Sequence, residues 1–158
     1  DSVALDVLSQ ILEFRLHERL RNTNKNFEEG VYRVYVNTEQ SFVHGLIGVT
    51  FATRSKSFRD RAEAIILKEI ESLKRHLVTN EEISMIKERL DTEYLSAFYQ
   101  GTLGLCEMII DSAVNGDEDL VIFHSFRKNL KKVTRKKILA IANKYFTEYY
   151  ARAVVKPR

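Results

Sequence analysis

The chain has 158 residues, of which 44% are hydrophobic and 30% are charged, and its net charge is +3. This length predicts one domain over residues 1–158 with a sizeable core, and so mild a charge gives little support for a polyanionic partner. The single cysteine excludes an internal disulfide and a cysteine-based zinc cluster, and no apolar run approaches the ~20 residues that span a bilayer. Because the sequence opens on a helical pattern without methionine, we expect it to be a piece of a longer multi-domain chain.

The first third of the chain predicts a helix followed by two strands. The helix carries one apolar stripe of leucines at spacings of three and four, at Leu5, Leu8, Leu12, Leu16 and Leu20. Alternation predicts a strand over residues 31–36 and a second over about 41–53, and the short polar connection 37–40 favours an antiparallel hairpin. Gly48 predicts a bulge or a close backbone approach in the second strand.

Helical patterns follow in the rest of the chain. An apolar stripe runs over residues 58–77, and Thr79 with Glu82 forms a capping-box pattern at the start of the next helix. A further helix over about 103–114 is apolar on much of its circumference, so we expect it to be buried.

The last elements complete the fold prediction. Thr134 is expected to cap a final helix, and residues 151–156 predict a last strand. Long helices with few strands, and no regular βαβ alternation, predict an α+β fold. In it, several long helices pack against a small, mostly antiparallel sheet.

The chain offers little chemistry of its own. Its four histidines are His17, His44, His76 and His124. None lies within five residues of another, so the two histidines one helical turn apart that a zinc peptidase needs are missing. We therefore expect no metal and no other cofactor in this chain. Cys106 has no histidine nearby in the sequence and is expected to be a buried, inert thiol.

A basic run covers residues 127–137 and could follow phosphate groups electrostatically. It lacks the interleaved aromatic residues that stack on bases, and apolar residues interrupt it at helical spacing. Solvated helix ends account for it with fewer assumptions, so we do not expect a nucleic-acid partner.

The most informative stretch is the join between the first helix and the first strand. Arg19 and Arg21 give the helix a basic end, and Gly30 leads into a strand that opens with Val31 and Tyr32. A guanidinium and a phenol at such a join can bind the carbonyl oxygens of a peptide. We expect Gly30 and the strand alternation to fix the register of Tyr32.

Four segments carry a resemblance to a known family, in this order: LDVLSQILEFRLHERLR, GVY, NEEISMIKERL, and VTRKKILAIANKYF with ARAVVKP. They cover nearly the whole chain and resemble the C-terminal, non-catalytic type of domain in the pitrilysin, insulin-degrading enzyme and mitochondrial processing peptidase family of zinc metallopeptidases. The resemblance is closest to bacterial members. It implies that zinc is held by an inverted His-x-x-Glu-His helix in a catalytic domain elsewhere, on the same chain or on a partner chain. This chain is then expected to close the chamber around a peptide substrate without itself being an enzyme.

The resemblance also implies site residues. In the family, an arginine at the end of the first helix and a tyrosine that enters the next strand help to bind the peptide. The matching positions are Arg21 and Tyr32, and Arg19 competes with Arg21 because the loop between helix and strand is longer than usual. The family domain also begins with a strand before the first helix, whereas this chain begins at the helix. We therefore expect an open sheet edge and self-association, or strand exchange, through that edge.

Two alternative functions remain open. The chain could be the non-catalytic partner subunit of a two-chain processing peptidase, or an unrelated α+β interaction or nucleic-acid-binding domain. For the compartment, the bacterial periplasm is favoured, with the cytoplasm as the alternative.

Overall fold

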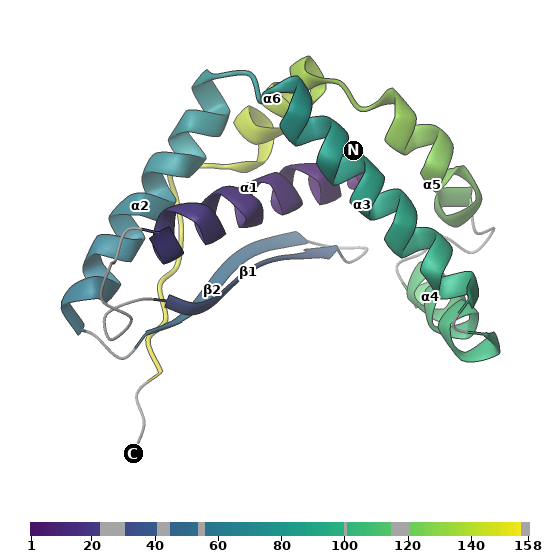
Figure 1. Ribbon diagram of the computed structural model, residues 1–158, viewed down its shortest axis with the longest axis horizontal. Helices are drawn as coiled ribbons and strands as arrows, with labels where there is room; N and C mark the ends of the chain where they lie inside the picture. Colours follow the sequence, from purple (N-terminus) through teal and green to yellow (C-terminus); the bar gives the residue numbers. More distant parts are fainter. Residues whose placement is uncertain (23–30, 41–44, 54–55, 100, 115–120, 156–158) are drawn as a thin grey trace.

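The computed structural model describes residues 1–22, 31–40, 45–53, 56–99, 101–114 and 121–155 (Figure 1). The described elements are α1 (Ser2–Asn22), β1 (Val31–Gln40), β2 (Gly45–Thr53), α2 (Lys56–Arg75), α3 (Asn80–Tyr99), α4 (Thr102–Val114), α5 (Val121–Lys132) and α6 (Arg135–Tyr145). This part of the chain is mostly helical, with a small antiparallel sheet of two strands. The predicted α+β fold class is confirmed.

Helix α1 lies in the middle of the molecule, with the sheet on one side and α2 and α6 on the other (Figure 1). The predicted leucine stripe is buried: Leu8 is 1% exposed, and Leu12 and Leu16 are fully buried. Val7 and Ile11 are also fully buried, although 100° of rotation per residue places them roughly opposite that stripe. Because apolar residues occupy both sides of α1, this helix can be enclosed between two layers.

Strand β1 pairs with β2 from Val31, opposite Thr53, to Gln40, opposite Gly45. The hairpin was correctly predicted, but the expected connection at 37–40 is wrong. These four residues continue the ladder against residues 45–48, and the connecting residues 41–44 lie outside the described part. The pairing extends over the polar residues because backbone groups, not side chains, make the ladder.

The expected irregularity at Gly48 is also wrong. Gly48 pairs with Asn37 in regular register, and a Cβ added to it would meet no atom within 4 Å. The irregularity lies at the start of β1, between Val31 and Arg33. Two steps along β1 there accompany one step along β2, from Thr53 to Ala52, which is the pattern of a β-bulge.

Local capping signals were read correctly. The Glu82 side chain accepts a hydrogen bond from the Thr79 N–H (2.7 Å), and the Thr79 hydroxyl accepts one from the Glu82 N–H (3.1 Å). This reciprocal pair is the predicted capping box. Thr134 caps α6 by accepting a hydrogen bond from the Lys137 N–H.

Helix α4 contradicts the expectation of a buried helix. Gly101, with a φ of 81°, precedes α4, which contacts α3 and α5 and extends away from α1 and the sheet (Figure 1). Leu103 is 72% exposed and Ile110 58%, and Cys106 is exposed as well. An apolar composition favours burial, but these neighbours cover only part of the circumference of α4.

The C-terminal segment contradicts the expected last strand, because residues 151–155 are irregular. Side-chain contacts with α2 replace strand pairing. Arg152 Nη1 lies 2.6 Å from the Glu63 carboxylate, and Arg152 Nη2 lies 3.0 Å from that of Asp60. The Tyr150 hydroxyl also contacts the Glu63 carboxylate, at 3.2 Å.

Candidate functional site

Contacts between α1 and β1 show that the two elements run antiparallel. The Asp6 carboxyl accepts a hydrogen bond from the Thr38 side chain, and Glu13 Oε2 accepts one from the Val36 N–H at 2.8 Å. Moving forward along α1 therefore means moving back along β1. The end of α1 and the start of β1 consequently lie at the same end of the molecule (Figure 1).

This arrangement brings the backbones of the predicted site residues to one end. Arg21 belongs to the last turn of α1 and Tyr32 is the second residue of β1. Their side chains lie outside the described residues, as does Gly30. The β-bulge falls at Tyr32, between Val31 and Arg33. The register of Tyr32 stays a prediction, because its side chain lies outside the described residues.

Arg19, the competing arginine, is engaged in an ion pair. Its Nε lies 3.1 Å from Oε1 of Glu69, whose side chain on α2 is only 5% exposed. A buried carboxylate needs a compensating cation. Arg19 therefore has a structural task that accounts for its position in the sequence.

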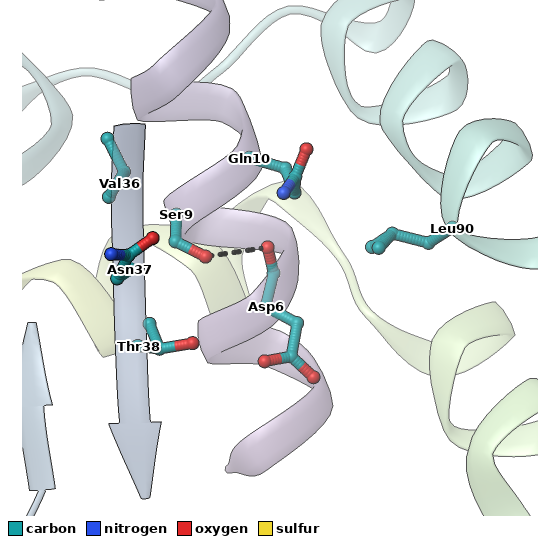
Figure 2. Close-up of a pocket in the computed structure, with 7 residues that line it drawn as sticks. All are labelled: Asp6, Ser9, Gln10, Val36, Asn37, Thr38 and Leu90. Carbon is teal, nitrogen blue, oxygen red and sulfur yellow. Dashed lines mark hydrogen bonds between the residues drawn. The ribbon is translucent and has the colours of Figure 1, made fainter. Parts of the chain in front are cut away.

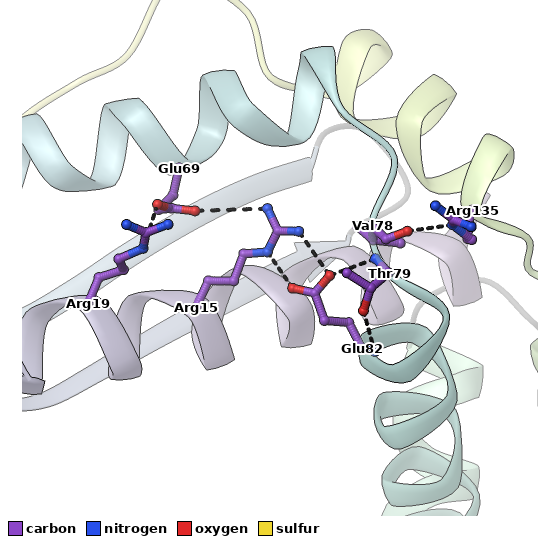
Figure 3. A network of polar contacts seen from close by, with 7 residues as sticks. All are labelled: Arg15, Arg19, Glu69, Val78, Thr79, Glu82 and Arg135. Carbon is purple, nitrogen blue, oxygen red and sulfur yellow. Dashed lines mark hydrogen bonds and ion pairs between the residues drawn. The ribbon is translucent and has the colours of Figure 1, made fainter.

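Arg15, one turn before Arg19, joins the same network (Figure 3). It donates two hydrogen bonds to the Glu82 carboxylate, at 2.6 and 3.0 Å, and its Nη1 lies 3.8 Å from Glu69 Oε2. We call Arg15, Arg19, Glu69 and Glu82 the paired cluster. It links α1 to α2 and to the capped start of α3.

Electrostatics in the paired cluster favour the charged forms. The hydrogen bond from Arg15 lowers the pKa of Glu82, and the same bond raises the pKa of Arg15. With two guanidinium groups and two carboxylates, the cluster balances its own charge. Sequence reasoning missed it because Arg15 and Glu82 are separated by 67 positions; the only sequence signal is a glutamate in the apolar stripe of α2.

A second polar site lies nearer the start of α1, and its acceptor groups are not fully compensated by hydrogen-bond donors or cations. A cleft of about 420 Å³ opens between α1, β1 and α3 (Figure 2). We call it the α1–β1 cleft; its lining residues are Asp6, Ser9, Gln10, Val36, Asn37, Thr38 and Leu90. Sequence reasoning did not identify it.

Two acceptor groups in the α1–β1 cleft lack full compensation. Burial raises the pKa of Asp6 to about 6, although the Thr38 hydrogen bond and the N-terminal ammonium oppose this shift. Gln10 Oε1 is buried and makes no hydrogen bond within the described part of the chain. The Ser9 hydroxyl is already used, because it donates to the Asp6 carbonyl oxygen at 3.0 Å.

Other functional classes gain no support from the geometry. Among the described residues, no group of three His, Cys, Asp or Glu side chains could hold a metal ion, so these residues do not fit a zinc centre. His44 lies outside the described part. No helix in the same part is both long and apolar enough to cross a membrane. Within the basic run, Arg127 donates two hydrogen bonds to the Asp91 carboxylate, at 2.6 and 2.9 Å, which commits that arginine to the fold.

Comparison with protein families gives one match. Residues 1–90, more than half of the chain, match the family described as the peptidase M16 inactive domain. This match confirms the family resemblance that the sequence segments indicated. No curated protein sequence matches the chain significantly.

Comparison with solved structures supports the same fold. A protease from Helicobacter pylori is similar over 92% of this chain and 35% of its own, with a TM-score of 0.70 and 18% identity. The periplasmic protease PqqL from Escherichia coli is similar over 91% of this chain and 15% of its own, with a TM-score of 0.65 and 15% identity. The chain thus spans about a third of the first protein and less of the second.

Proposed function

Because this chain belongs to the peptidase M16 inactive-domain family, we propose that it is the catalytically silent domain of a zinc metallopeptidase, which closes the chamber and helps to bind the peptide substrate. The zinc-binding catalytic domain is then another part of the same chain or a partner chain. Both similar structures are proteases of which this fold forms only a part, which supports that arrangement. PqqL is described as periplasmic, which supports the bacterial periplasm as the compartment.

In this proposal, Arg21 and Tyr32 donate hydrogen bonds to a carbonyl oxygen of the bound peptide. Negative charge develops on that oxygen during attack, so both donors stabilise the transition state more than the ground state. The antiparallel packing of α1 on β1 is the observation that carries the proposal, because it sets the two backbone positions at one end of the molecule. The ion pair of Arg19 with Glu69 favours Arg21 as the arginine that contacts peptide.

The proposed donors can be tested in the assembled peptidase that contains this domain. Tyr32→Phe and Arg21→Ala should each lower kcat/KM by about 100-fold, the usual effect of losing one such donor. Tyr35→Phe is the matched control, because Tyr35 is a half-exposed tyrosine of the same strand, and it should leave the rate unchanged. Equal rates for Tyr32→Phe and Tyr35→Phe would refute the assignment of Tyr32.

The isolated chain provides a second test. It should show neither peptidase activity nor stoichiometric zinc, and one tightly bound equivalent of zinc would overturn the proposal.

We also propose self-association through the open edge of the sheet, since the two strands described leave one edge each without a strand partner. Light scattering should then show a mass that rises with concentration, whereas a clean monomer at high concentration contradicts this part.

A further inference from the structure

We propose that the α1–β1 cleft binds a lysine or arginine side chain, with its cationic head at the Asp6 carboxyl and with Gln10 Oε1 as a second acceptor for N–H groups of the ligand (Figure 2). The cleft volume of about 420 Å³ is in the range of small-ligand sites and exceeds what one long side chain needs. The inference deepens the proposed function, on which it rests only for the source of the cation, a peptide.

The polar atoms of the cleft select for a donor. The Asp6 carboxyl and Gln10 Oε1 are both hydrogen-bond acceptors, and the buried Gln10 Oε1 has no partner among the described residues. A buried acceptor without a partner costs free energy that a ligand N–H would recover. The raised pKa of Asp6 agrees with this reading, because burial removes hydration that the Thr38 hydrogen bond and the N-terminal ammonium compensate only in part.

The charge of the lining selects a cation over other donors. Asp6 is the only ionisable residue among the seven that line the cleft, so the site carries a single negative charge when that carboxyl is ionised. A divalent metal would require more oxygen ligands than one carboxylate and a few neutral groups readily supply. A guanidinium or ammonium needs only one carboxylate and additional acceptors.

The apolar part of the lining fits the stem of the same side chains. Val36 and Leu90 lie on different elements of the cleft wall, on β1 and α3 (Figure 2). Lysine and arginine carry three or four methylene groups that pack on apolar surface while the charged head stays polar. The apolar residues on β1 and α3 therefore suit the stem, and the Asp6 carboxyl on α1 suits the head.

The cleft also lies within reach of a peptide held at the other end of α1. Eleven residues separate Gln10 from Arg21 in the sequence, which corresponds to about 17 Å along a helix. About five residues of extended peptide span that distance. A basic residue about five positions away from the residue held by Arg21 could thus enter the cleft.

Binding of capped amino acids to the full chain tests the cleft alone. We expect N-acetyl-arginine amide and N-acetyl-lysine amide to bind in the millimolar range by titration NMR, with shifts confined to α1, β1 and α3. N-acetyl-norleucine amide, which keeps the stem without the charge, should not bind. Asp6→Asn should weaken the binding of the arginine compound at least tenfold and Gln10→Leu severalfold, whereas Glu18→Gln, an exposed carboxylate of α1, should not.

Each outcome separates the cleft from the peptide-binding proposal. Failure of both cationic compounds to bind overturns the cleft inference, even if Tyr32→Phe slows the assembled peptidase. Equal binding of the norleucine compound also overturns it, because the site would then be merely apolar. Spermidine serves to distinguish a free polyamine from a side chain: the inference requires it to bind no more tightly than the arginine compound. A thermal melt of Asp6→Asn shows whether weaker binding reflects lost folding.

Discussion

The paired cluster and the α1–β1 cleft lie on the same helix and handle buried charge in opposite ways. In the paired cluster, the buried Glu69 and the capping residue Glu82 each meet an arginine of α1 within 3.1 Å. In the cleft, compensation is incomplete: the pKa of Asp6 is raised, and the Gln10 oxygen has no partner in the part of the chain that the structure describes. The contrast teaches that burial of polar groups alone does not mark a binding site. A site is marked where the fold leaves those groups without a partner.

The largest effect is expected from removing the hub of the paired cluster. Arg15→Ala leaves the Glu82 carboxylate without its bidentate partner and leaves Glu69 with Arg19 alone. Removing one member of a buried ion pair costs about 3–5 kcal/mol, and the lower end applies here because both side chains are 16% exposed. Urea unfolding should show the loss as a lower free energy of unfolding.

The matched control is Arg75→Ala, which removes an exposed i,i+4 pair with Glu71. Such surface pairs contribute less than about 1 kcal/mol. If both variants lost the same small free energy of unfolding, the ion pairs of the paired cluster would contribute no more than exposed surface pairs. The contrast with the cleft would then disappear.

The second effect concerns Asp6 and has the opposite sign. A carboxyl whose pKa is raised from 3.8 to about 6 binds its proton more tightly in the folded state. The contribution of Asp6 to stability should therefore fall as pH rises from about 4 to about 6, and this group should cause no further loss at higher pH. Asp6→Asn removes this charge and should stabilise the chain at neutral pH by about 3 kcal/mol, since the pKa rises by about 2.2 units and 1.36 kcal/mol accompanies each unit.

Chemical denaturation of both proteins across this pH range checks the sign. The difference in the free energy of unfolding should be small near pH 4 and reach its full size above about pH 6. A variant less stable than wild type at neutral pH would mean that Asp6 is compensated in solution. The cleft would then be another balanced site.

Features of the fold that depend on neighbours in the sequence were predictable. The capping box of Thr79 and Glu82 needs only residues three positions apart, and the leucine stripe needs only helical spacing. The burial of α4 was predicted wrongly for a physical reason. Its apolar composition indicates that a partner surface is favourable, but composition does not say whether this chain supplies it.

Features of the two polar sites depend on elements far apart in the sequence and could not be predicted. Arg15 meets Glu82 across 67 positions, and Leu90 joins a cleft whose other lining residues come from α1 and β1. The region where α1 ends and β1 begins was predictable only in part. The helix and the strand were predicted from local pattern, whereas the bulge between Val31 and Arg33 depends on pairing with β2.

A smaller effect is expected from the capping box that Thr79 forms with Glu82 of the paired cluster. Thr79→Ala removes the hydroxyl that accepts the Glu82 N–H, but it leaves the Thr79 N–H and the arginine contact in place. Loss of a helix N-cap costs about 1 kcal/mol. Thr134 caps α6 and is not a member of the paired cluster, so Thr134→Ala should cost about the same. A much larger loss for Thr79→Ala would show that the cap and the ion pairs form one cooperative unit.

The smallest effect is expected from the unpartnered oxygen in the cleft. Gln10→Met keeps a long, flexible side chain and removes the buried acceptor, so it should raise the free energy of unfolding by up to about 1 kcal/mol. Gln10 has no charge, so unlike that of Asp6→Asn this gain should not depend on pH. In a fully paired site, removal of a hydrogen-bonding side chain would destabilise the fold instead. A loss of stability in Gln10→Met would therefore show that Gln10 Oε1 has a partner in solution, and the cleft would lose one of its two acceptors.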